Sequence, residues 1–121
     1  MPDLLSRDQL KAEVQAAQQE LLAIRRHLHA HPELSGNEHQ TAALVAGELR
    51  KLGWRVQEGV GRTGVLAELG PSGGPVVALR VDMDALPVEE RTGLPYASLN
   101  QGLMHACGHD IHTTAGLGVA R

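Results

Sequence analysis

The sequence predicts an α/β fold in which helices come first along the chain and pack on a mixed sheet. Two early segments carry apolar residues at helical spacing, and three later segments have the patterns of strands. A chain of 121 residues, 42% hydrophobic and 21% charged, is typical of one modest domain or part of a larger one. Its core must be built from Leu, Val, Ala and Ile, because Trp54 and Tyr96 are the only aromatic residues.

The first helix is predicted by one apolar stripe at spacings of three and four, formed by Leu10, Val14, Ala17, Leu21, Ile24 and Leu28. Ser6 followed by Gln9 resembles a capping box, which marks a helix start. Pro32 disfavours helical backbone at the residue before it, so we expect the helix to close near His31.

A second helix is predicted from about Glu38 to Leu52, with its apolar residues on one face. Asn37 is the expected N-cap, and Gly53 fits the position just after the helix end.

The hydrophobic pattern then changes to that of strands. Residues 54–58 ("WRVQE") alternate as a half-buried strand does, and residues 63–70 ("TGVLAELG") form a second candidate. "PSGG" is a turn. Residues 75–87 ("PVVALRVDMDALP") begin with an unbroken apolar run, which predicts a strand covered on both faces.

A last helix is expected from Ile111 to the end of the chain, with Asp110 placed to cap it. Three strands are fewer than a closed sheet normally needs. We therefore expect the domain to continue beyond these residues.

Composition excludes several functional classes. The net charge of −3 and the lack of a basic stripe interleaved with aromatics argue against nucleic acid. The first ten residues do not resemble a signal peptide, and no apolar run approaches the ~20 residues that span a bilayer. A single cysteine forms no internal disulfide, so the cytoplasm is the expected compartment.

Residues 104–113 ("MHACGHDIHT") concentrate metal-binding side chains. Cys107 and His109 lie on the same side if this stretch is extended, so both can face one point just before the helix. A thiolate and an imidazole are good ligands for zinc and similar metals. Hydrophobic packing does not explain why four such side chains lie within six residues. They are Cys107, His109, Asp110 and His112.

Asp82 and Asp84 follow the predicted buried strand, where active sites of open α/β sheets lie. They can bind a metal directly or orient a ligand. They can equally cap a turn, which is the commoner use of such aspartates.

Each of these features also has a structural interpretation. His27, His29 and His31 lie at a helix end, where histidine often interacts with the helix dipole or with solvent. A lone cysteine such as Cys107 is commonly a buried structural thiol. Arg80 can extend from a strand end to solvent as easily as it can anchor a substrate.

A resemblance to a known family rests on three stretches of the sequence: "RRHLHAHPELSGNEHQ", "RVDMDALP" and "HACGHDIH". From about Leu21 to the last residue, the chain resembles the N-terminal part of metal-dependent amidohydrolases related to hippurate hydrolase. That group includes the aminoacylases and the auxin-conjugate hydrolases.

This resemblance implies that residues 1–121 are the N-terminal portion of a zinc-exopeptidase-like catalytic domain, without the lid or dimerisation domain. It implies two divalent metal ions (zinc, manganese, cobalt or nickel), hydrolysis of small N-acyl amino acids, and a possible homodimer for the full-length form. Cys107 and His109 match metal ligands, and Asp84 matches an aspartate that orients the metal site. The roles of Asp82 and His112 stay open.

The resemblance also places the general base, a glutamate, downstream of this chain, so the isolated chain is expected to be inactive. Two other classes remain open from the residues alone. One is a hydrolase that uses Cys107 as nucleophile and a histidine as base. The other is a truncated, non-catalytic remnant or metal-binding module.

Overall fold

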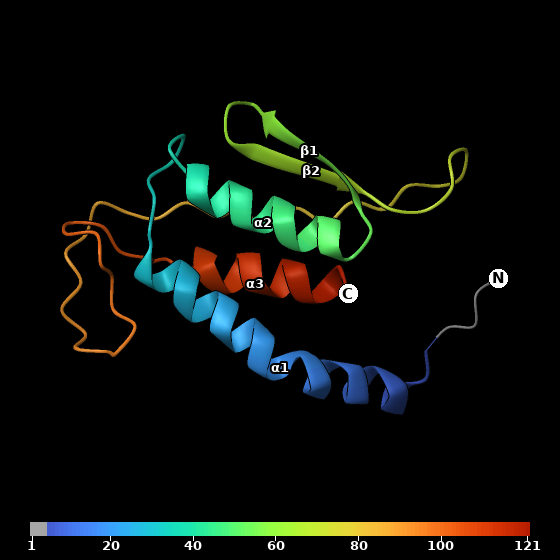
Figure 1. The fold of residues 1–121 in the computed structure, drawn as a ribbon, viewed down its shortest axis with the longest axis horizontal. Coiled ribbons are helices and arrows are strands. Elements are labelled where there is room, and N and C mark those ends of the chain that lie inside the picture. The colour runs from blue at the N-terminus through green and yellow to red at the C-terminus, as the bar shows by residue number, and fades with distance from the viewer. Residues whose placement is uncertain (1–4) are drawn as a thin grey trace.

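The computed structural model describes residues 5–121. Its three helices lie side by side, and a two-stranded sheet lies next to one of them (Figure 1). The elements in chain order are α1 (Arg7–Ala30), α2 (His39–Lys51), β1 (Arg55–Val60), β2 (Gly64–Glu68) and α3 (His109–Val119). Helix α3 packs against both α1 and α2, and the β1–β2 hairpin packs against α2. The α/β class is confirmed.

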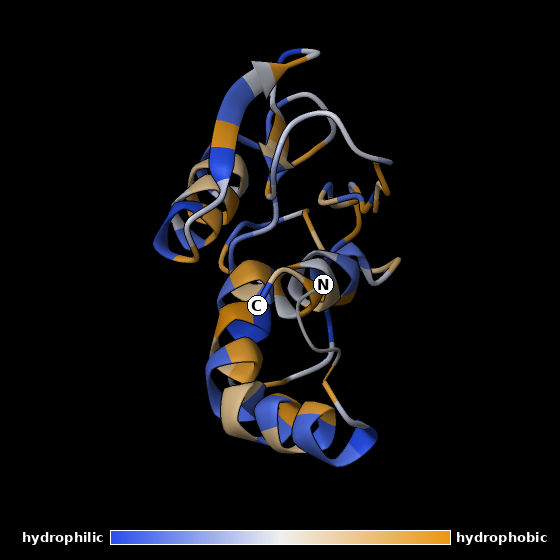
Figure 2. Cartoon of the chain, turned by 90° about the vertical axis from the view of Figure 1, so that its right-hand side faces the viewer, coloured by the Kyte–Doolittle hydropathy of each residue, from blue (hydrophilic) through white to orange (hydrophobic). Residues whose placement is uncertain are grey.

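Helix α1 begins and ends as predicted. The Ser6 hydroxyl accepts from the Gln9 backbone N–H at 3.3 Å, and the Ser6 backbone N–H donates to Gln9 Oε1 at 2.8 Å. The apolar stripe is buried only near its end, because α3 does not extend along the first half of α1. Leu10 and Val14 are 54% and 58% exposed, whereas Leu28 is 2% exposed. Apolar and polar residues alternate along this helix in Figure 2.

Helix α2 matches its predicted range, but its cap differs. Glu38, not Asn37, is the N-cap residue, and its side chain makes no capping bond. The carboxylate of Glu33 accepts instead from the backbone N–H groups of Gln40 and Thr41, at 3.0 and 2.7 Å. A negative charge from the preceding loop therefore satisfies the free donors at the start of this helix.

Strands β1 and β2 pair antiparallel, with Arg55 opposite Glu68 and a register shift between Glu58 and Val60. This hairpin confirms the two strands expected after α2. The Trp54 indole N–H donates to the carbonyl of Ala120 at 2.9 Å, which ties the end of α3 to the start of the hairpin.

The predicted third strand, residues 75–87, does not form. Val76 and Val77 are 90% and 96% exposed. The segment makes only single bridges near its end, one joining Leu34 to Ala85 and one joining Leu86 to Met104. A buried strand needs neighbours on both sides, and among residues 5–121 no strand pairs with residues 75–84. Within them the sheet is an antiparallel hairpin, not the expected mixed sheet.

The interior of the described chain is small and unusually polar. Its buried apolar residues are Leu28, Ala30, Pro32, Ala42, Ala46, Ala85 and Leu117. Its buried polar residues are His29, Glu38, Thr41, Thr63, His105, Asp110, Thr113 and Thr114. Most of the polar ones lie around the start of α3, where the candidate site is found. No helix among residues 5–121 combines the length and hydropathy needed to cross a bilayer.

Candidate metal centre

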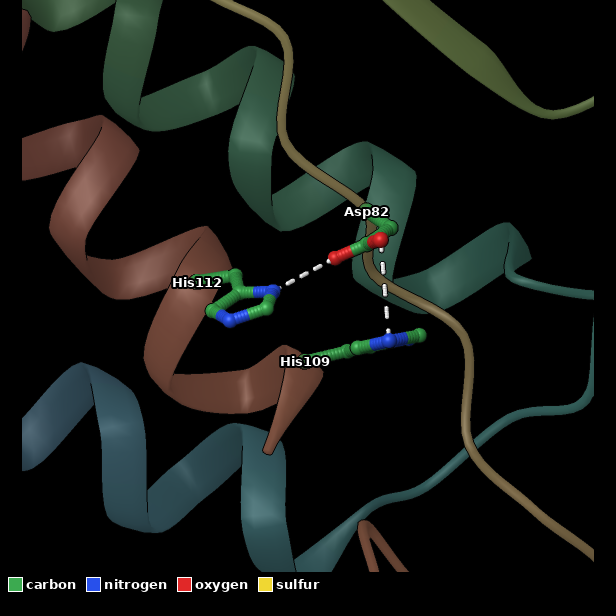
Figure 3. A group of neighbouring side chains, drawn as sticks. All are labelled: Asp82, His109 and His112. Atoms are coloured by element: carbon green, nitrogen blue, oxygen red, sulfur yellow. Dashed lines mark hydrogen bonds and ion pairs between the residues drawn. The ribbon is translucent and has the colours of Figure 1, made fainter. Parts of the chain in front are cut away.

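Three side chains converge between the extended segment before Ala85 and the first turns of α3 (Figure 3). Asp82, His109 and His112 each offer one ligand atom, and these atoms lie within 4.8 Å of one another. His112 is exposed, while Asp82 and His109 are half-buried. The group is therefore open to solvent on one side and supported by protein on the other.

The start of α3 places both histidines. The helix begins at His109, earlier than the predicted Ile111, and its N-cap is Gly108 rather than Asp110. Gly108 has φ +86°, a left-handed conformation that favours glycine, and this turn brings His109 directly into the helix. His109 and His112 are then three residues apart on one helix face, with their rings stacked at 5.4 Å.

Asp84 orients the His109 ring. The Nδ1 atom of His109 lies 2.9 Å from Asp84 Oδ1 and 3.0 Å from the Asp84 backbone oxygen. Both oxygens only accept, so Nδ1 carries a proton and Nε2 is the nitrogen that faces Asp82. Nε2 lies 3.5 Å from Asp82 Oδ2. A carboxylate at one ring nitrogen, as Asp84 is at Nδ1, is typical of imidazoles that bind a metal through the other nitrogen.

Asp82 lies between the two imidazoles. Its Oδ1 atom is 2.7 Å from Nδ1 of His112. This hydrogen bond is the main reason that the pKa of Asp82 falls below its ordinary value; burial opposes the shift and the nearby His109 assists it. The hydroxyl of Thr113 donates to the Asp82 backbone oxygen at 3.0 Å and fixes the segment against α3.

The predicted site residues are therefore only partly brought together. Asp84 contacts His109, but Cys107 is exposed and lies outside the group of Asp82, His109 and His112. Sequence reasoning left the last member, His112, without a role. The signal that points to it is its spacing of three from His109 in the same helix.

His105 is a further polar residue beside the site. It is 5% exposed, and neither ring nitrogen has a hydrogen-bond partner among the described residues. Burial is the main cause that lowers its pKa, and Asp110 opposes that shift. Burial therefore favours the neutral form of this imidazole.

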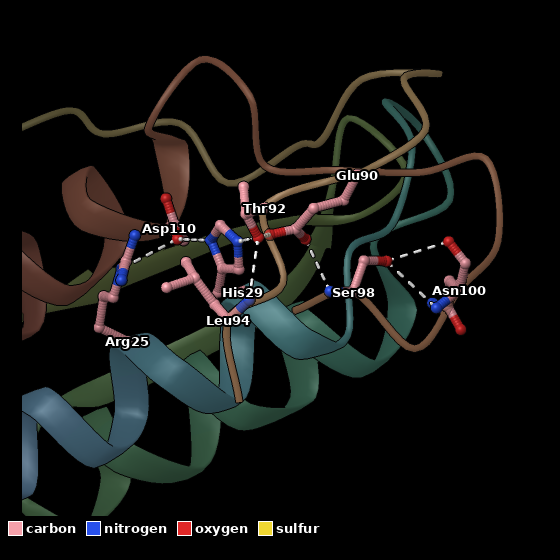
Figure 4. Close-up of polar contacts among 8 residues, drawn as sticks. All are labelled: Arg25, His29, Glu90, Thr92, Leu94, Ser98, Asn100 and Asp110. Atoms are coloured by element: carbon pink, nitrogen blue, oxygen red, sulfur yellow. Dashed lines mark hydrogen bonds and ion pairs between the residues drawn. The ribbon is translucent and has the colours of Figure 1, made fainter. Parts of the chain in front are cut away.

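Asp110 is not the N-cap residue of α3, although its Oδ1 atom accepts from the Ile111 backbone N–H in the first turn, at 3.0 Å. Its Oδ2 atom points into the interior, where it meets Arg25 and His29 from α1 (Figure 4). His29 is itself 3% exposed, although the sequence placed it among the histidines at a helix end.

Known proteins resemble this chain over its site residues. The sequence profile of peptidase family M20/M25/M40 matches residues 78–121, which contain both aspartates and α3. An N-acetyl-L-cysteine deacetylase of Bacillus subtilis is 53% identical over 104 residues, or 85% of this chain and 25% of that protein. A hippurate hydrolase of Campylobacter jejuni is 46% identical, over 85% of this chain and 27% of that protein.

The chain is similar to the N-terminal part of M20-family peptidases and amidohydrolases. The resemblance predicted from the two motif blocks is thereby confirmed. A solved structure agrees: a Bacillus subtilis protein described as a dinuclear metal-binding peptidase of the M20 family superposes with a TM-score of 0.81 at 44% identity. The match covers 88% of this chain and 30% of that one. The chain thus spans less than a third of the length of these M20 relatives.

Proposed function

We propose that this chain carries part of the metal site of an amidohydrolase that cleaves the amide bond of small N-acyl amino acids. The observation that carries the proposal is the orientation of His109, whose Nδ1 atom is held by Asp84 while Nε2 faces Asp82. The two relatives named for N-acetyl-L-cysteine and hippurate support the substrate class, since both compounds are N-acyl amino acids.

The donor set fits divalent cations such as zinc, manganese, cobalt or nickel. Imidazole nitrogen and carboxylate oxygen suit all of them, and a thiolate adds affinity for the softer ones. Ligands of one cation lie about 3–4 Å apart when each bond is about 2.1 Å. The 3.5 Å between His109 Nε2 and Asp82 Oδ2 falls in that range.

His109 is the first proposed ligand, through Nε2, and Cys107 the second, through a thiolate. Asp82 and His112 are placed to add an oxygen and a nitrogen. Asp84 is a positioning residue, because its contact to Nδ1 fixes the tautomer that leaves Nε2 free. Bound divalent metals supply an activated water and polarise the scissile carbonyl.

The alternative in which Cys107 is a nucleophile requires a base beside the thiol. Among residues 5–121, no imidazole nitrogen forms a hydrogen bond with the Cys107 sulfur. The exposed thiol therefore lacks the partner that such a mechanism uses. The proposal also holds that the chain alone, as part of a site, turns over substrate slowly or not at all.

The experiment follows hydrolysis of N-acetyl amino acids and N-benzoylglycine by this chain at high concentration, with each of the four metals and after chelation. We expect no turnover in the chelated sample, and we expect the His109→Ala variant to lose whatever turnover a metal supports. Hydrolysis that persists in metal-free buffer would contradict the proposal, as would activity unaffected by loss of the His109 imidazole.

A further inference from the structure

His29 is buried between two carboxylates (Figure 4). Its Nδ1 atom lies 2.7 Å from Asp110 Oδ2, and its Nε2 atom lies 3.0 Å from Glu90 Oε1. The side chains of Asp110 and Glu90 are 0% and 3% exposed. Water therefore has little access to either contact, and the ring must satisfy both oxygens itself.

Each nitrogen of the His29 ring faces a carboxylate oxygen, and this determines how many protons the ring must carry. A neutral imidazole carries one N–H and can donate to only one of them. Burial raises the pKa of Glu90, but hydrogen bonds from the Thr92 hydroxyl, the Ser98 backbone N–H and His29 outweigh it and hold the pKa at about 2. Glu90 is thus ionised at neutral pH and accepts at Nε2, so a proton is required there as well as on Nδ1.

The surrounding charges balance that of an imidazolium. Arg25 lies 3.1 Å from Asp110 Oδ2, so one fixed cation faces the two carboxylates and an imidazolium at His29 would supply the second. The other titratable groups that face His29 are Tyr96, in edge contact at 5.7 Å between centroids, and His105, at 6.4 Å. Neither forms a hydrogen bond to the His29 ring, whose two nitrogens are both taken.

This cluster joins three segments that are far apart in the sequence. His29 belongs to the last turn of α1, and Asp110 belongs to the first turn of α3, next to His109. The carboxylate of Glu90 also holds Ser98 through its backbone N–H, at 2.6 Å. Any displacement of Asp110 would shift the helix turn that carries His109.

We propose that His29 is a positioning residue, held as an imidazolium between Asp110 and Glu90, which fixes the first turn of α3 and thereby the direction of the His109 ring. The link to metal binding rests on the function proposed above, whereas the charge state of His29 does not. The residue touches neither substrate nor metal, and it acts through Asp110 and the backbone of α3.

The charge state is tested directly on the unmodified, metal-free chain by long-range ¹H–¹⁵N NMR of the histidine rings, with His29→Gln used for assignment. We expect both His29 nitrogens to show the protonated shift above neutral pH, with the exposed His39 ring recorded in the same spectrum for comparison. A His29 spectrum with one unprotonated nitrogen under those conditions would overturn the proposal.

The positioning role is tested by Zn²⁺ affinity, measured by competition with a chromophoric chelator. We expect His29→Gln and the milder Glu90→Gln to weaken binding by about tenfold, the lower end for residues that support ligands. His27→Gln, an exposed position in the same turn of α1, serves as the matched control and is expected to bind as the wild type does. Circular dichroism confirms that each variant is folded.

Unchanged affinity in folded Glu90→Gln and His29→Gln would refute the positioning role. If instead His109→Ala binds Zn²⁺ as tightly as the wild type, the proposed metal site fails while the NMR result on His29 still stands. If His29→Gln does not fold, Glu90→Gln and the wild-type spectrum decide the matter, because neither removes the ring.

Discussion

Three histidine rings at or near α3 are each oriented by a hydrogen bond to a carboxylate. Asp84 holds Nδ1 of His109, Asp82 holds Nδ1 of His112, and Asp110 holds Nδ1 of His29. In each pair the acid holds Nδ1, and this fixes the direction in which the other nitrogen of the ring points. The two aspartates of "DMD" thus pair with the two histidines of "GHDIH", and the aspartate of "GHDIH" pairs with His29. The sequence alone does not show which acid contacts which histidine.

The lowered pKa of Glu90 predicts how the stability of the fold changes in acid. Its pKa is about 2 in the folded chain against an ordinary 4.5, so its ionised form stabilises the fold fully above pH 4.5. That stabilisation is lost as the pH falls from 4.5 towards 2. Urea unfolding across this range should show a steep loss for the wild type and a shallower one for Glu90→Gln. Parallel pH profiles for the two proteins would refute the assignment.

Secondary-structure elements divide into those set locally and those set by distant partners. The capping box of Ser6 and Gln9 lies within four residues, and the sequence predicted the start of α1 from it. The caps of α2 and α3 were predicted wrongly for a physical reason. Glu33 reaches α2 across a loop, and α3 starts two residues before Ile111, so that Asp110 lies inside the helix with Oδ2 held by Arg25 and His29 and Oδ1 accepting from Ile111. Such contacts depend on tertiary packing, which a local pattern does not contain.

The contact of Glu33 with the start of α2 can be tested by substitution. Glu33→Ala removes the acceptor for two backbone N–H groups at the start of α2, so we expect the free energy of unfolding to fall by about 1–2 kcal/mol. The matched control is Glu13→Ala, on the exposed face of α1, which should change stability by less than about 0.5 kcal/mol. Urea denaturation measures both. Equal effects would mean that Glu33 does not cap the helix.

Among residues 5–121, three helices pack together, while the start of the apolar segment 75–87 is exposed to solvent. Helix α3 approaches residues 75–87 closely, because a Cβ atom at Gly116 would lie 3.1 Å from Val81. Beyond that contact Val76 and Val77 face solvent. The apolar run was correctly recognised in the sequence, but whether such a run is a buried strand depends on neighbours that the run itself does not encode.

Hydrogen exchange tests this description of the molecule. Among the described residues, no backbone N–H from 76 to 84 donates a hydrogen bond to another backbone group. We expect these amides to exchange at nearly the rate of an unfolded peptide, while those in the middle of α3 are protected by their helix. Mass spectrometry of peptides from each region provides the comparison. Strong protection of residues 76–84 would show that another strand or a second copy of the chain covers them.

The most direct test of the metal centre uses the one cysteine of the chain. Alkylation of Cys107 by iodoacetamide is timed with and without Zn²⁺ or Mn²⁺, in the wild type, in His109→Ala and in the control His39→Ala. If Cys107 and His109 bind a common cation, metal slows alkylation in the wild type and in His39→Ala, and this protection is lost in His109→Ala. Alkylation at the same rate with and without metal, or protection that survives in His109→Ala, would contradict it.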